Sequence, residues 1–98
     1  MNTLSAKITK HRRGWDVDTE VYWDGFKHPS HTGQGATTLA WALWRALELC
    51  ADGDATVTAI IVNDKPMSKA DAMDILRNKF GDGPLAYQLP RYEAALDG

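Results

Sequence analysis

The sequence predicts an α+β fold in which an antiparallel sheet packs against one long helix, followed by a second helix and a short C-terminal tail. Two alternating segments near the N-terminus predict a β-hairpin, because period-two alternation is typical of strands with one buried face. A helical stripe over residues 39–51 and a β-branched run over residues 55–63 predict the helix and a further strand. The expected order is β-β-(β)-α-β-α, in a single domain covering residues 1–98.

The hairpin rests on two patterns that agree in one register. The inward positions of the second strand are Trp15, Val17, Thr19, Val21 and Trp23, and the outward ones are Asp16, Asp18, Glu20, Tyr22 and Asp24. A four-residue loop over residues 11–14 would pair this strand with residues 4–9. In that register Ile8 faces Val17 inside, and Lys7 meets Asp18 outside.

The middle of the chain is expected to hold a short strand, a loop and the long helix. Residues 26–28 could form the third strand before a proline, and residues 30–35 are expected to be loop. Thr37 or Thr38 would then cap a helix that runs to about Ala51. The core face of this helix would consist of Leu39, Leu43, Ala46, Leu47 and Cys50.

The C-terminal half is expected to add one strand and one helix. Residues 55–63 are apolar on both faces, which indicates a well-covered strand, and residues 64–66 would turn the chain. Ser68 and Asp71 form a capping box that predicts the start of the second helix. Pro90 could open a short helix in the tail.

Composition excludes several classes of protein. The chain has 98 residues, 44% hydrophobic and 24% charged, with a net charge of −2, which argues against a general nucleic-acid binder. Cys50 is the single cysteine, so no internal disulfide can form. With no apolar signal region and no run of about 20 apolar residues, the chain is expected to be cytoplasmic. Dimerisation would help a core this small.

The outward face of the second strand is the main candidate for binding. Asp16, Asp18, Glu20 and Asp24 would project together, with Tyr22 among them. Same-face residues lie about 7 Å apart along a strand. This spacing approximates that of nucleic-acid phosphates, so the face would attract a basic groove on a partner protein. The alternative is an ordinary solvated strand face, partly neutralised by Lys7.

A second candidate lies on the first long helix. Trp41 falls toward its polar side near Arg45, and an exposed Trp beside Arg is typical of an interface anchor. Trp41 could equally cover the edge of the core or a dimer seam. The basic loop over residues 10–13 has too few charges for a nucleic-acid footprint, so we interpret it as solvated. The candidate partner-binding residues are therefore Asp16, Asp18, Glu20, Tyr22, Asp24, Trp41 and Arg45.

No pattern predicts catalysis, a metal or a cofactor. His28 and His31 flank a proline in a loop, and one cysteine gives no paired zinc motif. There is no nucleophile elbow and no HExxH sequence, and exposed carboxylates would lack the raised pKa that acid–base catalysis needs. Residues 32–38 lead into a helix N-terminus without the lysine of a Walker loop. We interpret them as a flexible loop that could accept a phosphate or a partner carboxylate.

Several short patterns resemble a known family. They are residues 6–9 (AKIT), 14–18 (GWDVD) and 24–25 (DG), an alanine-rich helix, and the strand over residues 57–63. Over about the first sixty residues the chain resembles the small anti-CRISPR inhibitors carried by phages and mobile elements, one of which, a short type I-F inhibitor, has a similar order of elements. The helix from Met67 and the tail extend beyond this pattern. The resemblance implies binding to a CRISPR effector subunit and blocking of its DNA or nuclease, with the acidic strand face engaging a basic DNA groove.

Two other classes of interaction protein remain open. Residues 35–37, leading into Ala40 and Ala42, resemble the helix start of antitoxins of the HicB kind. Such antitoxins usually carry a DNA-binding segment, and the mixed charge of residues 68–80 does not indicate one. A phage assembly protein is the third alternative, and it would form a stable oligomer.

Overall fold

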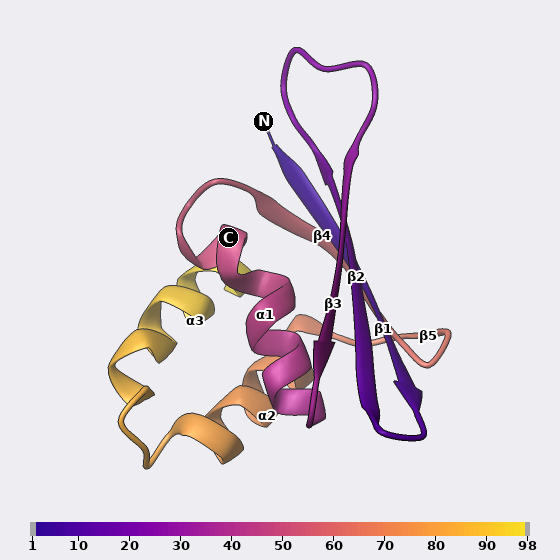
Figure 1. Cartoon of the computed structure of the whole chain (residues 1–98). Helices are drawn as coiled ribbons and strands as arrows, with labels where there is room; N and C mark the ends of the chain where they lie inside the picture. Colours follow the sequence, from indigo (N-terminus) through magenta and orange to yellow (C-terminus); the bar gives the residue numbers. More distant parts are fainter. Residues whose placement is uncertain (1, 98) are drawn as a thin grey trace.

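The computed structural model describes residues 2–97 as one sheet with helices on one side of it (Figure 1). The elements are β1 (Thr3–His11), β2 (Gly14–Tyr22), β3 (Ser30–Ala36), α1 (Leu39–Ala51), β4 (Thr56–Val62), β5 (Lys65–Pro66), α2 (Lys69–Phe80), a 3-10 turn η1 (Ala86–Gln88) and α3 (Leu89–Asp97). The five strands lie in the order β3-β2-β1-β4-β5. The α+β class predicted from the sequence is therefore confirmed.

The hairpin of β1 and β2 has the predicted register. Ile8 pairs with Val17 and Lys7 pairs with Asp18. His11 and Gly14 also pair, so the connecting loop is two residues long rather than four. The register is set by the apolar pattern, because a shift of one residue would turn the buried side chains of the shifted strand into solvent.

The sheet is mixed, so the prediction of an antiparallel sheet is wrong. β1 pairs in parallel with β4, because α1 carries the chain across the sheet and returns it beside β1 in the same direction. The predicted order also lacked β5, whereas the short tail helix expected to open at Pro90 is found as α3. The single long helix is not found either: α1 has 13 residues, α2 has 12 and α3 has 9.

The third strand lies later in the chain than predicted. Residues 26–28 belong to the loop between β2 and β3, and Phe26 is 76% exposed there. The strand is instead Ser30–Ala36, which contains Gly33 and Gly35 and has little β propensity of its own. Pairing with β2 along its whole length holds this segment extended, and no local pattern could reveal that pairing.

β4 covers the core through a bulge. Its register against β1 shifts by one residue at Thr58, whose hydroxyl donates to the Leu4 carbonyl at 3.1 Å. The shift turns both Val57 and Ile60 into the core. Ile61, on the other face of the strand, is partly buried.

One core joins the helices to the inner face of the sheet. Leu4, Ile8 and Leu43 are fully buried within it. Between the helices, the Trp44 ring lies 4.6 Å from that of Phe80 and 4.4 Å from that of Tyr92, centroid to centroid. These contacts fix α2 and α3 against α1, so the helical layer sits on one side of the sheet only.

The two longer helices begin at side-chain caps. Thr38, rather than Thr37, caps α1, because its hydroxyl accepts the backbone N–H of Trp41 at 3.2 Å. Ser68 accepts the N–H of Asp71 at 3.0 Å, as its capping-box sequence predicts. Asn63 and Asp64, with positive φ angles, make the turn between β4 and β5.

Candidate functional site

The sheet face opposite the helices is open, and β2 places its carboxylates on it. Val17, Thr19 and Val21 point into the core, so the alternate residues point away from the helices. We call Asp16, Asp18 and Glu20 the acidic row. The side chain of Asp16 is 62% exposed and that of Glu20 is 34% exposed. The structure thus brings three of the predicted site residues together on one accessible surface.

Two histidines contact the ends of the acidic row. The Nε2 atom of His11 lies 3.2 Å from Oδ1 of Asp16, and Nδ1 of His31 lies 3.9 Å from Oε2 of Glu20. The Nδ1 atom of His11 accepts the backbone N–H of Arg13 at 3.2 Å, so the neutral ring presents its Nε2 proton to Asp16. Each imidazole adds positive charge to the row only when it is protonated.

Asp18, at the centre of the row, has no basic partner. Lys7 lies opposite it in the register, yet Nζ of Lys7 lies 4.0 Å from Oδ1 of Asp64. Within residues 2–97 no Lys, Arg or His nitrogen lies within 4.0 Å of the Asp18 carboxylate. The predicted meeting of Lys7 and Asp18 is therefore a register pair without an ion pair.

Tyr22 belongs to the row's face, whereas Asp24 does not lie on the strand. A hydrogen bond from the Tyr22 hydroxyl to the Glu20 carboxylate, followed by the charge of that carboxylate, raises the pKa of Tyr22. Tyr22 is therefore a neutral, half-exposed aromatic at the end of the row. β2 ends at Tyr22, and the backbone N–H of Asp24 donates to Oδ1 of Asn2 at 2.8 Å. Asp24 is thus held in the following loop, beyond the strand pattern that predicted it.

The neighbouring strand leaves one side of the row bare. Gly33 of β3 pairs with Asp18, and Gly35 pairs with Asp16, so no β3 side chain stands beside either carboxylate. A hollow of about 370 Å³ results, lined by Asp16, Asp18, Gly33, Gln34 and Gly35. Asp18 also lines a second hollow of about 270 Å³ toward β1. The central carboxylate is therefore approachable from two sides.

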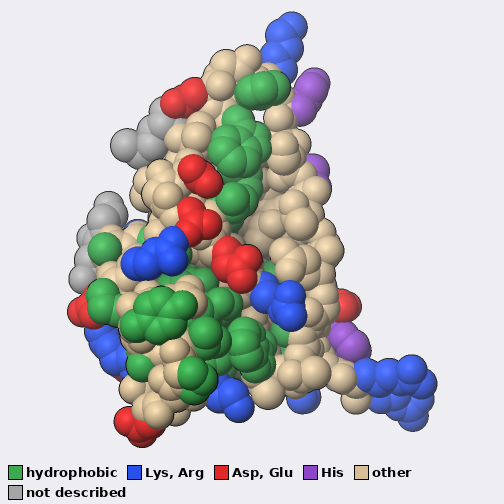
Figure 2. Space-filling model, turned by 60° about the vertical axis from the view of Figure 1, so that its left-hand side comes forward, with side chains coloured by type: hydrophobic (Ala, Val, Ile, Leu, Met, Phe, Trp, Pro, Cys, Tyr) green, Lys and Arg blue, Asp and Glu red, His purple; other side chains and the backbone are tan. Residues whose placement is uncertain are grey.

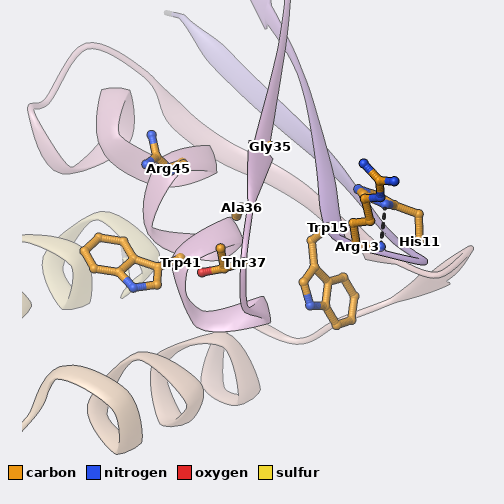
Figure 3. A pocket seen from close by; sticks show the side chains of 8 residues that line it. All are labelled: His11, Arg13, Trp15, Gly35, Ala36, Thr37, Trp41 and Arg45. Carbon is orange, nitrogen blue, oxygen red and sulfur yellow. Dashed lines mark hydrogen bonds between the residues drawn. The ribbon is translucent and has the colours of Figure 1, made fainter.

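Trp41 and Arg45 lie elsewhere, around the junction of β3 and α1 (Figure 3). They line a hollow of about 380 Å³ together with His11, Arg13, Trp15, Gly35, Ala36 and Thr37. No carboxylate lines this hollow. The guanidinium groups of Arg13 and Arg45 form no ion pair within residues 2–97. The structure does not combine Trp41 and Arg45 with the acidic row into one surface.

Trp41 is tied to the helical core by its ring. The ring packs edge-on against Phe80 at 4.9 Å and against Trp44 at 6.3 Å between centroids. In Figure 3 its side chain points from α1 toward the other helices, away from Trp15. Of the two interpretations left open by the sequence, these contacts favour a residue that covers the edge of the core.

Sequence reasoning missed two features of the surface. Gly33 and Gly35 lie beside the acidic row, and the only signal was their spacing of two, which matches a strand. Phe26 was placed in a strand, and its exposure at the loop between β2 and β3 has no sequence signal beyond the preceding Asp-Gly turn. Figure 2 shows that hydrophobic side chains gather over the helices, while the side toward the sheet is mostly backbone and uncharged polar groups.

The described part of the chain has neither a metal-binding cluster nor a membrane-spanning helix. Within residues 2–97, no three His, Cys, Asp or Glu side chains are placed to hold a metal ion together. Among the same residues, no helix has both the length and the apolar character needed to span a bilayer.

Comparison with known proteins gives no relatives: no family model, curated protein or solved structure matches the chain.

Proposed function

We propose that this chain is a binding protein that docks through the acidic row onto a basic surface of a nucleic-acid-handling protein. One observation carries the proposal: β2 projects three carboxylates from the sheet face that no helix covers. The carboxylates lie two residues apart, hence about 7 Å from one another. A basic groove that accepts a row of phosphates presents cations at a comparable spacing.

The bareness of the row supports docking over simple solvation. A cross-strand lysine or arginine stabilises an acidic side chain on a sheet, and a like charge destabilises it. Here Nζ of Lys7 lies near Asp64 and not near Asp18. On the β3 side, the residues that pair with Asp16 and Asp18 are glycines, which have no side chain. Asp18 has no basic partner within residues 2–97. A row of carboxylates on an open face attracts a positive partner from a distance and accelerates encounter, with a strong dependence on salt.

The particular form of the proposal is an anti-CRISPR inhibitor that blocks a CRISPR effector. The short sequence patterns over the first sixty residues support this form, and the acidic row supplies a surface that could occupy a DNA groove of the effector. In this form the chain carries out no reaction and needs no cofactor, because occupying the groove is sufficient.

The test measures target-DNA binding by purified crRNA-guided effector complexes of several types, with and without the chain. We expect wild-type protein to reduce DNA binding by at least one effector, and the variant D16K/D18K/E20K to lose this effect. The matched control is E48K/D54K/D82K, which changes the net charge equally at exposed residues outside the acidic row. Circular dichroism checks that both variants remain folded.

The possible outcomes distinguish the docking proposal from the antitoxin and assembly alternatives. Inhibition by D16K/D18K/E20K equal to wild type would show that the acidic row is not the docking surface. If no effector responds, the CRISPR form is wrong. Capture of a single small toxin, with rescue of growth, would instead support the antitoxin alternative, and a stable oligomer without any such partner would support the assembly alternative.

A further inference from the structure

β3 is an open edge of the sheet. It has seven residues, and within residues 2–97 its backbone pairs with β2 alone. Six of the seven residues are exposed. Alternate N–H and C=O groups along its outer side therefore have no backbone partner, which makes β3 a template for another strand.

The opposite edge of the same sheet is formed by β5, which pairs with Ile61 and Val62 at the end of β4. β5 is only two residues long, Lys65 and Pro66, and a short edge strand with lysine and proline discourages pairing. β3 contains no lysine, no proline and no bulge. The difference between the two edges marks β3 as the side on which a partner strand can be added.

The glycines of β3 connect this edge to the acidic row. Gly33 and Gly35 face the same side of the sheet as Asp18 and Asp16, with which they pair. The hollow of about 370 Å³ lies over them. A strand added outside β3 would lie about 10 Å from β2, which is two strand spacings. A long side chain from that strand could cross the bare glycines and approach the carboxylates.

The charge of the hollow selects the occupant. In an added strand every second side chain points to the open face. Two carboxylates border the hollow, no Lys or Arg lines it, and His31 is the only basic residue of β3. Lysine has a flexible four-carbon side chain, and arginine ends in a planar guanidinium that matches a carboxylate. Both side chains are long enough to reach across a strand whose facing residues are glycines.

We propose that β3 accepts an extended segment of the partner protein as an added strand, with Lys or Arg at alternate positions reaching Asp16 and Asp18. Backbone hydrogen bonds to β3 would supply affinity, and the acidic row would supply selectivity for basic residues. The choice of a basic segment rests on the proposed function of the acidic row. The availability of the β3 edge for strand addition does not depend on that function.

A seven-residue peptide with lysine at alternate positions and threonine between them is the probe. Binding is followed by ¹⁵N amide NMR of the full chain. We expect shifts at Ser30–Ala36 and β2, and none at Lys65. Because only one alternate set of backbone N–H groups can face β3, N-methylation of either the lysines or the threonines should abolish binding, and methylation of the other set should not.

Variants at the glycines test the crossing of β3. A Cβ on Gly33 would come within 3.6 Å of Oδ1 of Asp18, and one on Gly35 within 3.9 Å of the Trp15 carbonyl oxygen, both ordinary contacts. G33V and G35V should therefore fold, yet they should weaken the peptide by about tenfold by filling the hollow. T32V is the matched control, since Thr32 points to the other face, opposite Thr19. It should bind like wild type.

The outcomes keep the two proposals apart. If D16K/D18K/E20K abolishes effector inhibition while G33V and G35V preserve both inhibition and peptide binding, the strand-addition proposal is wrong and the docking proposal stands. Peptide binding that tolerates both N-methylated forms would also overturn strand addition. So would a concentration-dependent dimer through β3 that excludes the peptide, because the occupant would then be a second copy of the chain.

Discussion

The two faces of β2 share one backbone but differ in burial and in polarity. On the inner face, Val17, Thr19 and Val21 are buried under the helices. On the outer face, Asp16 and Asp18 are exposed, and the β3 residues that pair with them are Gly35 and Gly33. The inner face holds the fold together, and the outer face contributes little to stability. Substitutions on the two faces should therefore have separable effects.

The sheet face opposite the helices carries a carboxylate, Asp18, at its centre. The helices α1, α2 and α3 build a layer with its own aromatic contacts, and this layer lies on one side of the sheet (Figure 1). An uncovered sheet face is commonplace, but a central carboxylate on it without a basic partner is unfavourable for the isolated chain when neighbouring charges are alike. Binding is the explanation that we test.

The largest effect on stability is expected at the inner layer. Leu43 of α1 is fully buried, so L43A should lower the free energy of unfolding by about 3 kcal/mol, through lost burial and a cavity. Urea denaturation followed by tryptophan fluorescence measures this. D18A on the open face is the control and should remain close to wild type. Equal losses in both would contradict the division between the faces.

Trp41 should behave as a residue of the core edge. W41A removes its contacts with Phe80 and Trp44 and should cost about 2 kcal/mol, less than a fully buried aromatic. R45A, one turn along the same helix, should leave stability unchanged, because Arg45 is exposed and unpaired within residues 2–97. A W41A protein of normal stability that loses effector inhibition would show that Trp41 is an interface anchor.

A smaller loss is expected at the start of α1. T38A removes the hydroxyl that accepts the Trp41 N–H and should cost about 1 kcal/mol. T37A, one residue earlier, should have almost no effect. Thermal denaturation of the two variants compares them directly, and a reversed order would contradict the assigned cap.

The smallest effect on stability at neutral pH concerns Cys50. Burial raises the pKa of the Cys50 thiol to about 11, from an ordinary value of 9.0. The raised pKa means that folding favours the neutral thiol, so this contribution is complete below pH 9 and is lost as the pH rises toward 11. Iodoacetamide at pH 8 should label Cys50 only in the unfolded chain. Rapid labelling of the folded chain would show that the helical layer is open there.

The sequence predicted the elements whose signal is local. The alternation of β1 and β2 predicted their register. The capping residues predicted two helix starts, at Thr37 or Thr38 and at Ser68, and the structure places the first cap at Thr38. The parallel pairing of β4 could not be predicted, because alternation carries no information about strand direction. β3 was missed because its pairing with β2 holds it extended, whereas its glycines have little strand propensity of their own.

The candidate site was predictable only in part. Period two placed Asp16, Asp18 and Glu20 on one face, and the structure keeps them there. The loss of the Lys7 contact depends on Asp64, fifty-seven positions away, and the bare glycines depend on the position of β3. Whether a charged strand face is neutralised is thus decided by long-range contacts.

Carboxyl footprinting measures whether Asp18 is accessible in the free chain, and it needs no partner. The free chain is treated with a carbodiimide and an amine, and modification of Asp18 is compared by mass spectrometry with that of Asp82, an exposed residue after α2. Our account predicts that Asp18 reacts at a rate close to that of Asp82. Strong protection of Asp18 in the free monomer would mean that the chain covers its own carboxylates, and would contradict the account.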